Sequence, residues 1–84
     1  MLLFTVNETY MITGRGLLLT PGLQDKSAKI GDRLKLVKPD KTILVTVITG
    51  IVFNDRRDIL VGSNLTKDDV PIGTEVWLQN EYEI

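Results

Sequence analysis

The 84-residue sequence contains neither cysteine nor histidine. Without cysteine, disulfide bridges and thiolate metal sites are excluded. Without histidine, the chain lacks the commonest general base, the commonest zinc ligand and every Ser–His or Cys–His nucleophile pair. An enzyme built from the remaining residues needs paired carboxylates in a cleft, for which a small, filled domain has little room. We therefore expect a protein that is not an enzyme and that holds no metal and no cofactor.

Long apolar runs are also missing. No stretch approaches 18 consecutive apolar residues, the length expected of a membrane-spanning helix. The opening "MLLFTVNE" has no basic region, and Asn7 and Glu8 interrupt its apolar residues, so it does not follow the pattern of a signal peptide. These absences predict a cytoplasmic protein without a membrane partner.

The charges nearly balance, but they are unevenly placed. An apolar content of 43% with 25% charged residues is ordinary for a soluble domain, and the length predicts a single domain over residues 1–84. From Arg15 to Lys41 there are seven basic residues against three acidic ones, and no basic residue follows Lys67. This asymmetry indicates either a charged partner or a solvated surface of uneven charge.

Short stretches rich in Val, Ile, Leu and Thr, separated by Gly, Pro, Asn and Asp, predict strands throughout the chain. One helical turn is expected after Thr66, because Thr66 and Asp69 have capping-box spacing. Gly50 indicates a bulge or bend inside a strand. The six expected strands are about Leu2–Ile12, Leu17–Thr20, Arg33–Val37, Thr42–Phe53, Ile59–Val61 and Glu75–Tyr82.

Six short strands in a flat open sheet would expose their edges, and closure into a barrel removes them. The sequence therefore predicts an all-β fold, a small closed barrel of six antiparallel strands. Alternation along the strands predicts the side chains that fill it. They are Leu17, Leu19, Ile30, Leu34, Leu36, Val45, Val47, Ile51, Ile59, Val61, Val76 and Leu78.

Two segments, "KIGDRLKL" (29–36) and "PIGTEVWL" (71–78), share one pattern. An isoleucine that tucks in, followed by a glycine with positive φ, would bring the chain into a strand at the same angle twice. Chance similarity is the alternative. If the pattern is structural, Gly31 and Gly73 both have positive φ.

The stretch "ITGRGLLLTPG" (12–22) has the glycine content of a phosphate-binding loop but not its spacing. A dinucleotide fingerprint needs a third glycine and a following helix, and a P-loop needs Gly-x-x-x-x-Gly-Lys-Ser/Thr. Neither pattern is present, so we expect no GTP binding. Gly14 and Gly16 are predicted to serve the turn between two strands.

Four stretches, in order, resemble the second domain of the elongation factor Tu class of translational GTPases. They are "YMITGRGLLLTPGL", "AKIGDRLKLV", "VTVITGIVF" and "DILVGSNLTKDDVPIGTEVWL". The likeness covers about Phe4 to Leu78. Its Gly-Arg-Gly and Ile-Gly-Asp elements are moderately specific together and weak singly. The resemblance implies an elongation factor Tu domain 2-like translation-protein barrel, with six antiparallel strands in a Greek key.

The chain also departs from that family. The 84 residues contain neither its GTP-binding domain nor its third domain, and Pro21 stands where the family usually has glycine. The segment after the fourth strand is shortened to "NDRRD" (54–58), where the family has a longer segment that helps form the pocket for the terminal adenosine of aminoacyl-tRNA. The resemblance therefore implies the barrel but not capture of the aminoacyl end of tRNA.

Basic side chains are the candidates for a binding function, because cations on a surface can contact RNA phosphates. The alternative for those of the third expected strand is a solvated face that protects a strand edge, and for those of the 54–58 segment it is local pairing and turn formation. For Arg15 the alternative is a rim position where it pairs with a carboxylate, and in each case this alternative is the favoured one. Trp77 is a candidate for protein contact, with partial burial against a loop as the alternative. The RNA-binding candidates are Arg15, Arg33, Lys35, Lys38, Lys41, Arg56 and Arg57.

These observations predict a non-catalytic binding module associated with RNA or the ribosome. The alternative is a protein-interaction module or a homo-oligomeric adaptor, a homodimer included, that has no nucleic-acid role.

Overall fold

The computed structural model, which describes residues 1–62 and 64–79, contains seven strands and one short 3-10 turn. No α-helix occurs in these residues, so the all-β prediction is confirmed. The 3-10 turn η1 spans Lys67–Asp69. The strands are β1 (Leu2–Thr5), β2 (Glu8–Ile12), β3 (Gly16–Thr20), β4 (Arg33–Val37), β5 (Ile43–Ile51), β6 (Ile59–Val61) and β7 (Glu75–Leu78).

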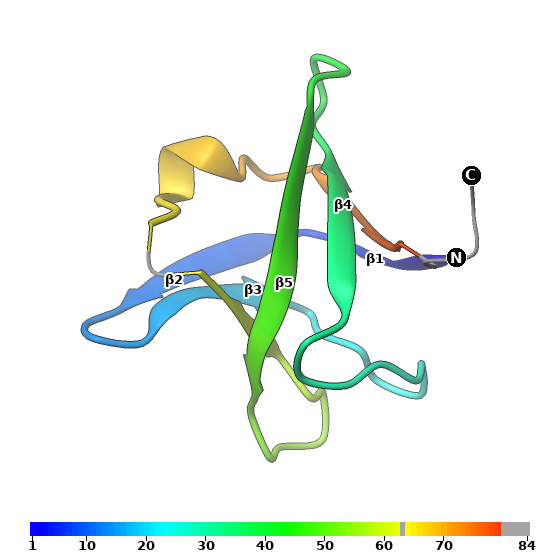
Figure 1. Cartoon of the computed structure of the whole chain (residues 1–84), viewed down its shortest axis with the longest axis vertical. Helices are drawn as coiled ribbons and strands as arrows, with labels where there is room; N and C mark the ends of the chain where they lie inside the picture. The colour runs from blue at the N-terminus through cyan, green and yellow to red at the C-terminus, as the bar shows by residue number, and fades with distance from the viewer. Residues whose placement is uncertain (63, 80–84) are drawn as a thin grey trace.

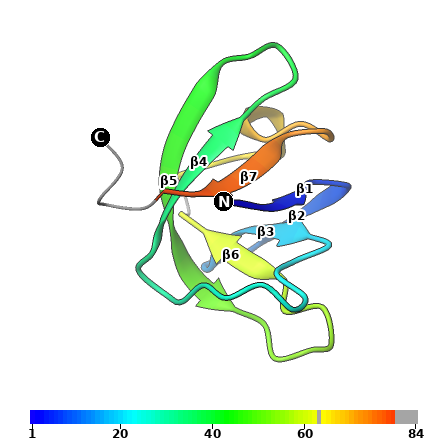
Figure 2. The same ribbon diagram turned by 90° about the vertical axis from the view of Figure 1, so that its right-hand side faces the viewer.

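All seven strands belong to one antiparallel sheet in the order β1-β7-β4-β5-β6-β3-β2. The sheet curls into a half-barrel (Figures 1 and 2). The prediction of a closed six-stranded barrel is therefore wrong, because there are seven strands and the order has β1 and β2 at its two ends.

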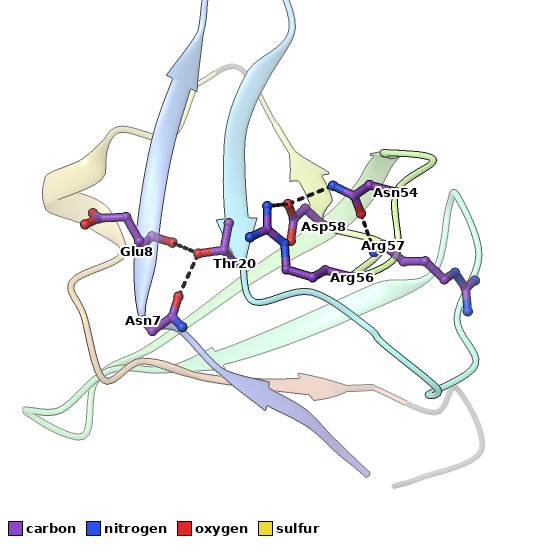
Figure 3. Close-up of polar contacts among 7 residues, drawn as sticks. All are labelled: Asn7, Glu8, Thr20, Asn54, Arg56, Arg57 and Asp58. Carbon is purple, nitrogen blue, oxygen red and sulfur yellow. Dashed lines mark hydrogen bonds and ion pairs between the residues drawn. The ribbon is translucent and has the colours of Figure 1, made fainter.

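The expected first strand, Leu2–Ile12, is divided because its partner changes halfway. The N–H of Val6 bonds to the carbonyl of Thr74, just before β7, and the N–H of Asn7 bonds to the carbonyl of Thr20 in β3. The hydroxyl of Thr20 lies 2.7 Å from Oδ1 of Asn7 and 3.1 Å from the carbonyl oxygen of Glu8 (Figure 3). These contacts hold the chain where it leaves one side of the sheet for the other.

The core lies inside the curl. Alternate residues of β3 and β4 are fully buried, and the loops after β3 and β6 contribute Leu23, Leu65 and Val70. Each fully buried leucine contributes about 1.5–3 kcal/mol relative to an exposed one. Two of the predicted core residues, Ile51 and Leu78, are partly buried and pack against this cluster. The predicted residues that are fully buried are Leu17, Leu19, Leu34, Leu36, Ile59, Val61 and Val76.

The two predicted core residues in β5 are wrong. Val45 is 58% exposed and Val47 is 39% exposed, whereas Ile48 is buried. Val45 pairs with Lys35 and Val47 pairs with Arg33 across the β4–β5 ladder. Paired residues share a face of the sheet, so both valines project outward with the basic side chains. β5 is apolar on both faces, and alternation alone could not tell which face is inside.

The two similar segments form similar turns. Gly31 and Gly73 have φ of +95° and +96°, as predicted. In both turns the residue after the glycine donates its N–H to the carbonyl of the residue three positions earlier, Asp32 to Lys29 at 3.0 Å and Thr74 to Pro71 at 3.1 Å. Positive φ at the third residue is the type II pattern. The isoleucines do not tuck in, however. Ile30 and Ile72 are 63% and 64% exposed, so the core prediction for Ile30 is wrong.

Three local predictions concern η1, Gly50 and the last strand. The capping interaction at η1 is present, since the N–H of Thr66 donates to Oδ2 of Asp69 at 2.9 Å. The register between β5 and β6 shifts between Ile48 and Gly50, so the strand is irregular at the position where a bulge or bend was predicted. The last strand ends at Leu78, and its predicted extension toward Tyr82 lies outside the described residues. No helix in the described part of the chain has the length and apolar character needed to cross a bilayer.

Candidate binding surface

The outward side of β4 carries basic residues in a regular alternation. Leu34 and Leu36 are fully buried, while Arg33 is exposed and Lys35 is half-buried on the opposite face. The outward direction predicted for the two basic residues is confirmed. Their contact with RNA stays a prediction.

Apolar side chains flank the basic ones. Lys35 lies between Val45 of β5 and Trp77 of β7 in the two ladders, and Arg33 lies beside Val47. Cross-strand neighbours on one face stand close together, so these side chains form one continuous area. We name this area the outer sheet surface and define it as Arg33, Lys35, Ile43, Val45, Val47 and Trp77. Val37 and the acidic Glu75 lie on the same face, so the area presents two cations and one carboxylate among apolar side chains.

Trp77 is half-buried, and its indole N–H donates to Oε1 of Glu75 at 3.0 Å. Because Trp77 pairs with Lys35, its ring lies on the outward side of the sheet. The acidic Glu75 next to it is therefore already engaged by a neighbour on the same strand. The role of Trp77 as a protein contact stays a prediction.

Lys38 and Lys41 lie in the turn between β4 and β5. The N–H of Lys41 bonds to the carbonyl of Lys38 at 2.9 Å, and Lys41 has a φ of +76°. Oδ1 of Asp40 accepts hydrogen bonds from the hydroxyl of Thr42 at 2.6 Å and from its N–H at 3.0 Å, and these bonds lower the pKa of Asp40. The turn thus presents two cations around one ionised carboxylate.

A second carboxylate, that of Asp32, lies at the other end of β4. The ammonium of Lys29 donates to Oδ1 of Asp32 at 2.9 Å, and the backbone N–H of Lys29 donates to Oδ2 at 3.0 Å. The bond from the ammonium is the main reason why the pKa of Asp32 is lowered. This carboxylate therefore engages Lys29 at the turn before β4.

Arg15 lies apart from this row. It is exposed in the β2–β3 turn, where its N–H bonds to the carbonyl of Ile12 at 2.9 Å. Figure 1 shows this turn at a different side of the molecule from the tip of the β4–β5 hairpin. The glycines beside it have φ of +77° and +120°, which confirms their predicted role in the turn.

Arg56 and Arg57 make the local contacts that were the alternative to RNA binding (Figure 3). Nη2 of Arg56 lies 3.1 Å from Oδ2 of Asp58, and Nδ2 of Asn54 donates to the same oxygen at 3.3 Å. The backbone N–H of Arg57 donates to Oδ1 of Asn54 at 2.6 Å, and its guanidinium donates to the carbonyl of Lys26. The 54–58 segment is therefore held in its conformation by hydrogen bonds and an ion pair among its own residues.

Asp58 is almost completely buried, which the sequence did not indicate. Its Oδ1 has no hydrogen-bond partner within the described part of the chain. Beside this segment lies a shallow, open depression lined by Gln24, Asp25, Asp55 and Arg56. Asp58 does not line it, so the depression and the buried carboxylate do not form a common site.

Several apolar residues in and just after β5 are exposed, which the sequence did not indicate. Ile43 is 59% exposed on β5, and Phe53 after β5 is fully exposed. The register of β5 against β4 would have shown which side chains of β5 face outward, because Leu34 and Leu36 mark the inner face of β4. That register depends on the turn between the two strands. Within residues 1–62 and 64–79, no three acidic side chains come together in a way that could hold a metal ion.

Comparison of the chain with protein-family models, with curated proteins and with solved structures gives no match.

Proposed function

We propose that the chain is a non-catalytic binding module and that it binds RNA through the outer sheet surface. The observation that carries this proposal is the placement of Arg33 and Lys35. Both project from β4 on the outward face, and Lys35 stands beside the aromatic ring of Trp77. Proteins that bind single strands combine cations that follow the phosphates with aromatic rings on which bases stack.

The geometry of a strand suits a repeating anionic backbone. Successive outward residues on a strand are about 7 Å apart, so Arg33 and Lys35 form a regular row. Lys38 and Lys41 continue the positive charge at the end of β4. Arg15, Arg56 and Arg57 lie elsewhere and are not part of the proposed surface. Three or four phosphate contacts make this a weak, sequence-tolerant site.

The resemblance to domain 2 of the elongation factor Tu class supports the same function. We propose that the curled sheet is a variant of that Greek-key barrel in which β1 and β2 together correspond to one family strand. Val6 bonds to Thr74 beside β7 and the next residue, Asn7, bonds to Thr20 of β3, so β1 and β2 follow each other without a loop. This supports the correspondence. The cytoplasm is the compartment that fits such a module.

The test measures binding of a single-stranded RNA over a range of salt concentrations by fluorescence anisotropy. Three or four contacts predict a slope of log K against log salt of about −2 to −3. The double variant Arg33→Glu/Lys35→Glu is expected to lose binding. Lys26→Glu/Lys67→Glu is the control, because it makes the same charge change at two exposed sites outside the surface. No binding in low salt, or equal loss in both double variants, would contradict the proposal.

A second candidate is a protein-interaction module, and the exposure of Ile43, Val45 and Val47 favours it. Exposed β-branched side chains gathered on one face are typical of a surface that another protein covers. A pull-down with and without RNase separates the two candidates. A partner that survives RNase treatment and is lost in Val47→Asp supports the protein-binding function, whereas a partner released by RNase supports RNA.

A further inference from the structure

The first half of β5 has a neighbouring strand on one edge only. Residues 43–47 pair with β4, and pairing with β6 begins at Ile48. Figure 1 shows the β4–β5 hairpin extending beyond the rest of the sheet. Within residues 1–62 and 64–79, no strand pairs with the edge of β5 that faces away from β4 along residues 43–46, and we call this stretch the open edge.

The backbone groups on this open edge can be identified from the ladder. The N–H of Lys38 bonds to the carbonyl of Thr42, and the N–H of Ile48 bonds to the carbonyl of Asp32. Bonded and non-bonded positions alternate in an antiparallel pair, so even-numbered residues of β5 bond to β4. Ile43 and Val45 consequently direct their N–H and C=O groups to the open edge. These four groups have no partner in the described ranges 1–62 and 64–79.

The side chains along residues 42–46 of this edge include neither a charge nor a proline, and the irregularity in β5 comes only later, between Ile48 and Gly50. Residues 42–49, "TILVTVIT", contain no charge, no proline and no glycine, and all but Leu44 are β-branched. Ile43 and Val45 are more than half exposed. Natural sheets usually protect such an edge with lysine, proline or a bulge, because an unprotected edge pairs with another strand.

We propose that two copies of the chain pair antiparallel along the open edge of β5, over residues 42–46, and join their sheets into one. This goes beyond the RNA-binding function and does not depend on it. The segment is self-complementary, because any antiparallel register within residues 42–49 places an uncharged residue opposite another. The joined sheet has an apolar centre formed by Ile43 and Val45 of both copies, with a β4 strand on each side.

Charge also favours a second copy as the occupant. Antiparallel pairing brings the tip of one hairpin, with Lys38 and Lys41, toward the segment that follows β6 in the other copy. That segment passes close to β5, since a Cβ placed on Gly62 would be 3.9 Å from Oγ1 of Thr46. It continues into η1, which carries Asp68 and Asp69 and lies on the side of β5 opposite β4 (Figure 1). Cations of one copy therefore approach carboxylates of the other.

Five residues from each copy are far fewer than the about 20–30 per side of a stable interface. The dimer is therefore weak and depends on protein concentration. Analytical ultracentrifugation of the RNA-free protein, from about 10 µM to about 1 mM, is expected to show the mass doubling within this range. A monomer at every concentration would overturn the proposal while leaving the RNA-binding function untouched.

Amide hydrogen exchange measured by NMR locates the contact. The amides of Leu44 and Thr46 bond to β4 and are protected at every concentration. The amides of Ile43 and Val45 exchange fast in the dilute protein and become protected as the dimer forms. A dimer in which these two amides still exchange freely would refute pairing along this edge, and this measurement needs no variant to fold.

Two matched variants complete the test. Val45→Lys places a charge at the centre of the open edge and is expected to raise the dimer dissociation constant at least tenfold. Val37→Lys adds the same charge to the same face one strand away from the edge, opposite Ile43, and is expected to leave dimerisation nearly unchanged. Equal dimerisation of Val45→Lys and the unmodified chain would contradict the proposal.

Discussion

Gly22→Ala and Gly31→Ala form a matched pair, because the two glycines share a backbone conformation but not their surroundings. Their φ values are +97° and +95°. A Cβ on Gly31 would have nothing within 4 Å, whereas a Cβ on Gly22 would lie 2.5 Å from the carbonyl oxygen of Arg56 and 2.8 Å from the carbonyl carbon of Arg57. The comparison therefore separates the cost of the backbone conformation from the cost of the close approach.

The expected magnitudes follow from these contacts. Alanine in the left-handed region costs about 1–2 kcal/mol at either position. At Gly22 the 56–57 backbone must also move away, although it accepts hydrogen bonds from the N–H groups of Leu23 and Gln24 at 3.1 and 2.8 Å. Losing two such bonds costs about 1 kcal/mol each. We therefore expect about 3–4 kcal/mol for Gly22→Ala, against a total stability of about 4–13 kcal/mol for a chain of this length.

Urea unfolding followed by the fluorescence of Trp77, the only tryptophan, measures both variants in one assay. The free energy of unfolding should fall by about 1–2 kcal/mol in Gly31→Ala and by at least about 1 kcal/mol more in Gly22→Ala. Equal losses in the two variants would refute the close approach of the loop after β3 to the 54–58 segment. An unchanged Gly31→Ala would refute the positive φ at that turn.

Four further variants test the core, the register of β5 and the ion pair before β4. Leu36→Ala removes a fully buried side chain and should lower the free energy of unfolding by about 2–5 kcal/mol, and an unchanged melting temperature would contradict its burial. Ile48→Thr should destabilise strongly and Val45→Thr hardly at all in thermal melts, and the reverse order would show that the register of β5 is wrong. The lowered pKa of Asp32 makes its charged form favourable in the folded state, so its contribution to stability is present above its ordinary value of 3.8 and is lost as the pH falls through the lower folded-state pKa. Asp32→Asn should therefore flatten the loss of urea resistance below about pH 4, and an unaltered pH profile would contradict this account.

Some parts of the fold could be predicted from local sequence because one physical signal decides them. The bounds of β4 and β6 are those expected, since β4 alternates basic and apolar residues and turn-forming residues precede β6. The positive φ at Gly31 and Gly73 was predictable from the repeated pattern, because glycine adopts that conformation without steric cost. Successive side chains of a strand point to opposite faces, so alternation with Leu34 and Leu36 was enough to place Arg33 and Lys35 on the outside.

The inner face of β5 depended on tertiary structure. Leu44, Thr46 and Ile48 alternate with Val45 and Val47, and neither set is charged, so hydrophobicity alone does not choose between them. The register against β4 makes the choice, and a shift of one residue would exchange the two faces. That register is set by the turn at Lys38–Lys41, where Lys41 adopts positive φ without being glycine.

The apolar part of the candidate surface and the extent of closure could not be predicted from local sequence. All seven basic residues were candidates, and Arg33, Lys35, Lys38 and Lys41 were expected to carry any RNA affinity. The structure places the first two on the outward face of β4, the other two in the turn that follows it, and Arg15 in the separate β2–β3 turn. Arg56 is engaged by Asp58, which is buried just before β6 and whose carbonyl accepts the N–H of Val52 just after β5. Likewise, the sheet ends at β1 and β2 because the chain changes its hydrogen-bond partner between Val6 and Asn7. Local sequence determines which segments are extended and which turns need glycine, since those preferences belong to single residues. Which face is covered, and which charges meet, depends on contacts between residues far apart in the chain, and these exist only once the sheet has formed.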